Sequence, residues 1–336
     1  MLDCLFKIGR ILALTPSTVN HTTPSLFRKA YQFLIFTIYT ACLILTKIYI
    51  KEYYMRYMSP YKVLLICLNI NYYVYNFYVL VIVMVTKRQL WMRLLVNLKN
   101  IDCQIKQGSF KLILILAHVA FFIVTSAGIY LYLIVFGLTY TELNIIDCFE
   151  NYSLFFYVIC TCITLYLILS RYKHQILLLQ KKRINIKQIK RNMLTLKESV
   201  NNFNDIFGWI ILLNIFYCAI KCLIFIDIMI KSREAGRSHF LRLYCVGIVL
   251  LNGAGISTTV LLCDAILKEF EKIWKIVFKM QIWSEHQKFE TFVAIVSHSR
   301  PKFTAARFFL IDRSTLFSIV NTILTFLLVL IQFKSG

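Results

Sequence analysis

Long apolar stretches recur along the chain and are separated by shorter, more polar segments. A helix needs about 20 apolar residues to cross the hydrocarbon core of a bilayer. Seven stretches reach that length, at residues 31–50, 63–85, 112–136, 152–170, 209–230, 241–263 and 310–333. A membrane β-barrel would instead show alternating segments of about ten residues. The pattern predicts an all-α polytopic membrane protein with seven transmembrane helices.

The polar segments after the fourth and sixth spans carry a helical pattern of their own. Apolar side chains recur mostly every three or four positions in residues 171–208 and again in 267–283. This spacing places them on one face of a helix. A further helical piece, 286–299, is expected to end before Pro301. We expect the fourth, fifth and sixth spans to continue as helices that pack into a cytoplasmic bundle. As the alternative, these extensions lie on the inner leaflet of the membrane, held by anionic lipid.

The composition excludes most soluble classes. Hydrophobic residues make up 59% of the chain and charged residues 16%, whereas average soluble domains have about 45–50% and about 25%. A soluble globular enzyme with this composition would expose too much apolar surface. Disorder is excluded for the opposite reason, because there is ample apolar surface to bury.

The basic residues lie mainly on one side of the predicted membrane. The N-terminal tail and the second, fourth and sixth loops hold 27 Lys and Arg, and the other side holds 7. Basic loops stay in the cytoplasm, so we expect a cytoplasmic N-terminus and an extracellular C-terminus. This orientation explains the net charge of +22 without a nucleic-acid partner. It is also the reverse of a G-protein-coupled receptor.

No motif in the sequence indicates catalysis, a metal ion or a cofactor. The 6 His residues form no HExxH pattern, and there is no G-x-S-x-G or glycine-rich phosphate loop. We therefore expect no enzyme and no cofactor. A transporter or an intramembrane enzyme remains the alternative. Against a transporter, the number of spans is odd, and only Gly253 and Gly255 hint at a broken helix.

Two charged residues fall inside the fifth span. Lys221 and Asp227 are six positions apart, which separates them by about 120° around a helix, so they do not share a face. Charges within a membrane span are candidates for function. Lys221 is expected either to meet a carbonyl or a neighbouring helix, or to contact a ligand.

The seventh span carries a polar seam. Residues Ser318, Thr322, Thr325, Val329 and Gln332 follow one another in steps of 4, 3, 4 and 3, a spacing that keeps them on one helix face. A hydroxyl seam that ends in a carboxamide fits a helix facing a shared water-filled axis. Small hydroxyl residues also allow close helix packing, and periodicity alone leaves both interpretations open.

The end of the chain resembles the signature of insect gustatory receptors, which reads Thr-Tyr, five hydrophobic residues, then Gln-Phe. Here the segment runs from Thr325 to Phe333, and residues 303–314 also resemble that family's entry to its last helix. Two positions depart from the family pattern. Phe326 stands in place of Tyr and loses a hydroxyl, and Arg307 stands where Gly is usual, which puts local packing or gating there in doubt.

The resemblance implies a homo- or heterotetrameric ligand-gated cation channel that needs no G protein. Its last helix, within 310–336, would line the pore, with Val329 and Gln332 at the outer gate. Residues 1–30 would form a cytoplasmic tail, 31–266 a six-helix ligand-binding domain, and 267–309 a cytoplasmic anchor. Plasma-membrane location in a gustatory neuron dendrite is implied as well. The alternative is an obligate co-receptor subunit that conducts only with a partner.

The same resemblance places a ligand pocket between the outer halves of the first six helices. Aromatic walls with a few polar groups suit a small tastant. Sugar-sensing members often carry an acid where this chain has Leu327, which favours a bitter or aversive compound. Asn151 begins a glycosylation sequon on the expected outer side. The candidate ligand-binding residues are Tyr72, Tyr73, Tyr130, Tyr132, Phe156, Tyr157, Lys221 and Asp227.

Overall fold

The computed structural model describes residues 9, 14–15, 26–55, 59–101, 107–136, 145–181, 185–234, 239–282 and 287–335. These residues are almost entirely helical, which confirms the predicted fold class. The elements are α2 (Leu26–Met55), α3 (Ser59–Phe77), the π-helix η1 (Tyr78–Val83), α4 (Arg88–Asn100), α5 (Gln107–Phe136), α7 (Ile145–Leu179), α8 (Ile186–Glu234), α9 (His239–Ile282), α10 (Gln287–His298), β1 (Thr304–Ala305), β2 (Phe309–Leu310) and α11 (Arg313–Ser335).

Each predicted membrane span falls on helical structure. Within the described residues, five helical segments are long and apolar enough to cross a bilayer, and they lie on α3–η1, α5, α7, α8 and α9. Helix α2 contains a shorter apolar segment, Ala30–Leu45. The seventh predicted span coincides with α11, although α11 is not among those five segments.

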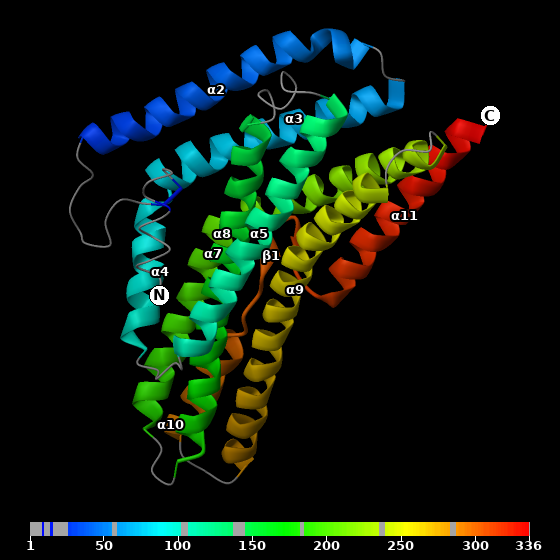
Figure 1. The fold of residues 1–336 in the computed structure, drawn as a ribbon. Coiled ribbons are helices and arrows are strands. Elements are labelled where there is room, and N and C mark those ends of the chain that lie inside the picture. Colours follow the sequence, from blue (N-terminus) through cyan, green and yellow to red (C-terminus); the bar gives the residue numbers. More distant parts are fainter. Residues whose placement is uncertain are drawn as a thin grey trace.

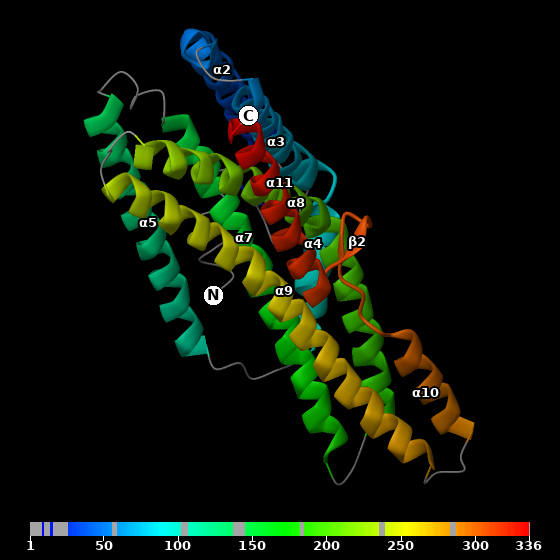
Figure 2. The same cartoon turned by 90° about the vertical axis from the view of Figure 1, so that its right-hand side faces the viewer.

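Long, closely packed helices form the body of the molecule. Helices α7, α8 and α9 run side by side along its length, and α10 lies at one end (Figure 1). Helices α2 and α3 lie at the opposite end, which we call the far end (Figures 1 and 2). Helix α11 stands at the edge of this assembly rather than within it.

The amphipathic segments are helices, as the sequence predicts. Helix α8 begins at Ile186 and continues without interruption through the fifth span to Glu234. Along its first half the side chains of Ile189, Met193, Leu196, Val200 and Phe203 are all buried. A side chain of this size contributes about 1.5–3 kcal/mol when it leaves water. This half of α8 is therefore held by apolar packing outside the predicted span.

A buried arginine joins α7 to the end of α4. The Nε and Nη2 atoms of Arg171 donate hydrogen bonds to the carbonyl oxygen of Leu98 at 3.1 and 2.9 Å. Leu98 lies in the last turn of α4, where helix carbonyls lack intrahelical partners. The positive charge also suits the negative end of the helix dipole. Arg171 thus fixes the crossing of α4 over α7.

A small β-hairpin connects α10 to α11, which the sequence analysis did not predict. Thr304 pairs with Leu310 and Ala305 with Phe309 in antiparallel register. The seventh span was expected to begin at residue 310, but α11 begins at Arg313. Asp312 ends the hairpin, because its carboxylate accepts a hydrogen bond from the backbone N–H of Thr315 at 3.0 Å. Such a side chain caps a helix N-terminus.

Helix α8 holds this hairpin at the level of Asn204. The Asn204 side chain donates to the carbonyl oxygen of Lys302 at 2.6 Å and accepts from the N–H of Thr304 at 3.2 Å. The rings of Phe203 and Phe303 meet edge to face, 5.8 Å apart. Two hydrogen bonds and an aromatic contact therefore attach the segment before β1 to α8.

The tip of the hairpin explains why a glycine suits position 307. Ala306 and Arg307 have φ angles of 50° and 66°, a left-handed conformation that costs a non-glycine residue about 1–2 kcal/mol. The guanidinium of Arg307 reaches the carboxylate of Asp205 at 3.0 Å, but the Arg307 side chain is 84% exposed. Exposed ion pairs of this kind add little to the free energy of unfolding. The departure from the family pattern therefore leaves backbone strain in the hairpin.

A glycine in α8 allows the hairpin to approach closely. A Cβ atom at Gly208 would lie 2.8 Å from the backbone nitrogen of Ala306 and 3.2 Å from the carbonyl oxygen of Thr304. Real Cβ atoms do not come that close to backbone, so any side chain here would push the hairpin away from α8.

We expect Gly208→Ala to destabilise the protein by about 1–3 kcal/mol, the usual cost of overpacking. Gly253→Ala is the matched control, because Gly253 is also helical and has no atom within 4 Å of an added Cβ. That control should gain about 0.5–1 kcal/mol from helix propensity. Thermal unfolding of both variants in detergent measures the difference. Equal changes in the two variants would refute the close contact.

Candidate functional site

Helices α3, α7 and α8 bring polar and aromatic side chains together near the far end. The side-chain oxygen of Asn151, in α7, accepts hydrogen bonds from the hydroxyls of Tyr72, in α3, and Tyr217, in α8, at 3.0 and 2.7 Å. The two tyrosine rings lie 5.1 Å apart. Both tyrosines are almost fully buried, so one amide joins three helices.

Lys221 completes this group from one turn further along α8. Its Nζ atom lies 5.8 Å from the ring centroids of both Tyr72 and Tyr217, and 5.5 Å from that of Phe225. Tyr217, Lys221 and Phe225 are four residues apart and therefore share one helix face. Cation–π contacts of this kind contribute about 0.5–2 kcal/mol, most when they are desolvated. Lys221 thus lies among one ring of α3 and two rings of its own helix.

A second set of buried polar groups begins at Glu150, the residue before Asn151 in α7. The carboxylate of Glu150 accepts a hydrogen bond from the hydroxyl of Tyr39, in α2. Asn76, in α3, donates to the same hydroxyl at 3.1 Å and accepts from the hydroxyl of Ser153 at 3.2 Å. We call Tyr39, Tyr72, Asn76, Glu150, Asn151, Ser153, Tyr217 and Lys221 the polar cluster.

Buried polar and charged groups like those of the polar cluster are unusual inside a membrane protein. Glu150, Asn76 and Ser153 are 3% exposed or less, and burying such groups is costly unless their hydrogen bonds are made. Connected networks of this kind fix a specific helix arrangement. Its amide, ammonium and phenol groups also offer the few placed polar contacts that orient a small ligand among aromatic walls.

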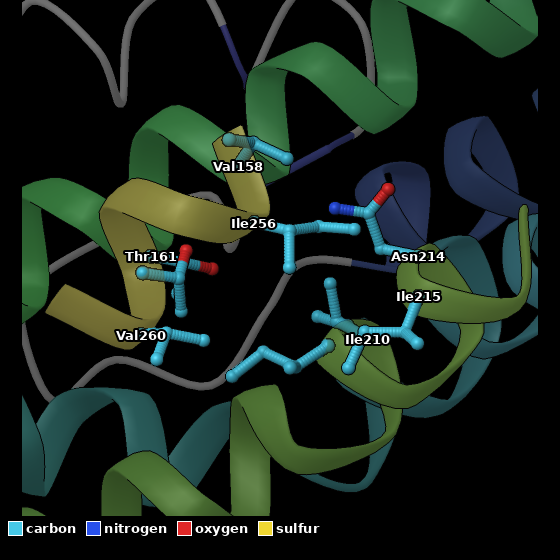
Figure 3. A pocket seen from close by; sticks show the side chains of 9 residues that line it. Val158, Thr161, Ile210, Asn214, Ile215, Ile256 and Val260 are labelled. Carbon is cyan, nitrogen blue, oxygen red and sulfur yellow. The ribbon is translucent and has the colours of Figure 1, made fainter. Parts of the chain in front are cut away.

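A small cavity lies between α7, α8 and α9, close to the polar cluster. Its volume is about 10 Å³, near the minimum that one water needs. Thr161 and Asn214 are the polar groups among its apolar walls, which include Ile256 and Val260 (Figure 3). A Cβ at Gly255 would come within 2.8 Å of Val158 on the same wall. The helices are therefore packed tightly here.

Four of the other candidate ligand residues lie outside the polar cluster. Phe156 and Tyr157 are completely buried, and the Tyr157 hydroxyl donates to the carbonyl oxygen of Leu14 near the start of the chain. Tyr73 and Tyr130 are exposed on the outside, at 37% and 63%. The side chains of Tyr132 and Asp227 lie outside the described part of the structure. Among the candidates whose side chains are described, Lys221 lies over the ring of Tyr72, and the rings of Phe156 and Tyr157 meet edge to face 5.8 Å apart.

Asn151 has a structural role that the sequon did not reveal. Its side-chain oxygen is engaged by two tyrosine hydroxyls, and a glycan on its nitrogen would compete with that arrangement. Glycosylation of Asn151 stays a prediction from the sequence. Tyr217, Asn76 and Glu150 were not among the candidates, and the one available signal was that Tyr217 precedes Lys221 by one helical turn.

The polar seam of the seventh span lies on an exposed face of α11. Ser318, Thr322, Thr325, Val329 and Gln332 are all exposed. The hydroxyls of Thr322 and Thr325 donate to the carbonyl oxygens of Ser318 and Asn321 within the helix. Large apolar side chains are exposed on the same helix, among them Phe317, Leu324, Phe326 and Leu328. A helix with so much uncovered apolar surface requires lipid or further protein around it.

Comparison with known proteins places this arrangement in a family. The model of the 7tm chemosensory receptor family matches residues 2–336. The chain belongs to the 7tm chemosensory receptor family. No curated protein matches the sequence as a relative.

Solved structures show the same fold. The chain is similar to the insect olfactory receptor OR5 from Machilis hrabei, with a TM-score of 0.65, 14% identity and coverage of 98% of this chain and 97% of that one. The structure of OR5 in complex with eugenol gives a TM-score of 0.70, again at 14% identity, with the same coverage of both chains. The seven-helix membrane receptor architecture is therefore shared despite little sequence identity.

Asn151→Ala tests whether the amide holds the three helices of this receptor together. The substitution removes the oxygen to which two buried tyrosine hydroxyls donate, which costs about 1–3 kcal/mol. We expect a lower unfolding temperature for the purified protein in detergent. Thr258→Ala, which removes an exposed hydroxyl bonded within its own helix, should leave that temperature nearly unchanged. An Asn151→Ala variant that keeps the wild-type unfolding temperature would show that the Asn151 amide is not needed to hold the three helices together.

Proposed function

We propose that this receptor is a subunit of a ligand-gated cation channel that detects small tastants at the plasma membrane of a chemosensory neuron. The observation that carries the proposal is the exposed seam of α11, which presents hydroxyls and Gln332 from the edge of the molecule. Copies arranged around an axis would turn these seams towards one another and line a polar path. The exposed apolar side chains of α11 would then face neighbouring helices and lipid.

The polar cluster supplies a ligand-sensing region in this proposal. Tyr72, Tyr217 and Lys221 present ring faces and one cation to the same place, which suits a small aromatic or polar compound. OR5 has been seen in complex with eugenol, a small molecule. The gustatory assignment rests on the C-terminal motif, and the bitter or aversive direction rests on Leu327.

The proposed orientation keeps the N-terminus and α10 in the cytoplasm and the C-terminus outside. The 27 basic residues of one side against 7 of the other support it. In this orientation the polar cluster lies towards the outside, where an external ligand arrives. Residues 31–266 then form the ligand-sensing body, 267–309 the cytoplasmic anchor, and 310–336 the pore helix.

Whole-cell current tests the proposal. Cells that express the chain, with G-protein signalling blocked, should pass a cation current when a panel of bitter compounds and sugars is applied. Gln332→Ala should change the ion selectivity or block of that current, because its carboxamide would border the pore. Leu324→Ala, an exposed change away from the seam on the same helix, is the matched control and should conduct like the wild type.

An epitope tag after Gly336, stained on intact cells, counts the receptors at the surface and reports an extracellular C-terminus. A current that Gln332→Ala leaves unchanged would contradict the pore assignment. No current from well-displayed receptors, followed by current after co-expression with a related subunit, would favour the obligate-subunit alternative.

A further inference from the structure

A groove runs between α8, β2 and the first turns of α11. Its volume is about 560 Å³. Leu212 and Phe216 of α8 and Phe309 of β2 form apolar walls, and Asp312, Thr315 and Ser318 contribute polar groups along α11. The volume falls within the range of about 300–1,000 Å³ that is usual for sites of small organic ligands. No residue of the polar cluster lines the groove, and Ile215 is the one residue that lines both the groove and the small cavity of Figure 3.

A carboxylate is fixed at one end of this groove. One oxygen of Asp312 accepts hydrogen bonds from the hydroxyl of Ser314 at 2.7 Å and the N–H of Thr315 at 3.0 Å. The neighbouring cation does not neutralise it, because the guanidinium of Arg313 turns to Asp264 at 2.8 Å. Within the described residues, no ion pair links Asp312 to a basic side chain.

We propose that this groove binds a small amphipathic cation, an amine or quaternary ammonium on an apolar body. The body would lie against Leu212, Phe216 and Phe309, and the positive group would lie beside the Asp312 carboxylate. The aromatic faces of Phe216 and Phe309 add favourable contacts for a cation. Charge complementarity favours this class of ligand: the carboxylate caps α11 through hydrogen bonds but has no ion-pair partner within the described residues, and it would repel an anionic molecule of the same size.

The polar cluster would not accept the same ligand. Lys221 already places a cation over the rings of Tyr72 and Tyr217, and a second cation there would be repelled. The repulsion applies at the Lys221 end of the cluster, because its carboxylate, Glu150, is buried and accepts a hydrogen bond from Tyr39. A ligand in the groove would also touch Ser318 and Thr322, so, resting on the proposed function, it would reduce the current through the channel.

Direct binding tests the site without relying on current. The full chain in lipid nanodiscs is dialysed against tetrapentylammonium, and bound probe is quantified by mass spectrometry above empty nanodiscs. Asp312→Asn should weaken binding about tenfold, because the quaternary ammonium loses its charge–charge attraction to the carboxylate. Asparagine still caps a helix, so α11 should keep its start. Phe216→Ala should weaken binding about fivefold through lost apolar contact.

Two controls make the result specific. Glu290→Gln removes a carboxylate of α10 that does not line the groove, and it should bind the probe like the wild type. The uncharged tripentylmethanol, of similar size, should show no dependence on Asp312. Block of the ligand-evoked current by the probe, lost in Asp312→Asn, would place the site next to the pore. Binding without any current in any variant would support the site and count against the channel.

Three outcomes would overturn the proposal. The first is wild-type binding no greater than in empty nanodiscs. The second is equal binding of the probe to wild type and Asp312→Asn. The third is that the wild type binds no cation, while Phe216→Ala loses either a co-purified phospholipid or the oligomer that native mass spectrometry detects. That result would assign the groove to an acyl chain or to a second copy of the chain.

Discussion

The attachment of the hairpin to the middle of α8 decides where α11 can stand. The Asn204 side chain bonds to the backbone on both sides of Phe303, and Gly208 lets the backbone at Ala306 come within contact distance. Asp312 then starts α11 immediately after β2. Helix α11 lies at the edge of the body (Figure 1), and this short segment fixes its first turn together with the ion pair from Arg313 to Asp264 of α9.

Helix α8 consequently serves two regions at once. Between Asn204 and Lys221 it passes from the hairpin to the polar cluster as one uninterrupted helix, a distance of about 25 Å at the usual rise per residue. A change in the rings or amide around Lys221 has a continuous element through which to reach the base of α11. Physical continuity alone is not coupling. In the proposed channel, α8 contacts both the polar cluster and the hairpin that precedes the pore helix.

The sequence predicted the helices better than the contacts between them. The seven apolar stretches all fall on helices, five of which contain a segment long and apolar enough to cross a bilayer within the described residues. The spacing of Ile189 to Phe203 located the buried face of α8. The hairpin was missed because two-residue strands have no periodicity, and its turn carries Ala306 and Arg307 where glycine would mark it. Lys221 stood out as a charge in an apolar span. Its partner Tyr217 bonds to Asn151 across 66 residues, and nothing local in either segment indicates that pairing.

The most direct test of this account measures current through receptors altered at Asn204. The Asn204→Ala variant loses both hydrogen bonds to the hairpin, whereas Asn204→Asp keeps an acceptor for the N–H of Thr304. With equal numbers of receptors at the surface, the current at a saturating concentration of an active compound should fall in the order wild type, Asn204→Asp, Asn204→Ala. Two hydrogen bonds at about 1 kcal/mol each predict at least a fivefold loss for Asn204→Ala. An Asn204→Ala receptor that conducts like the wild type would contradict the account.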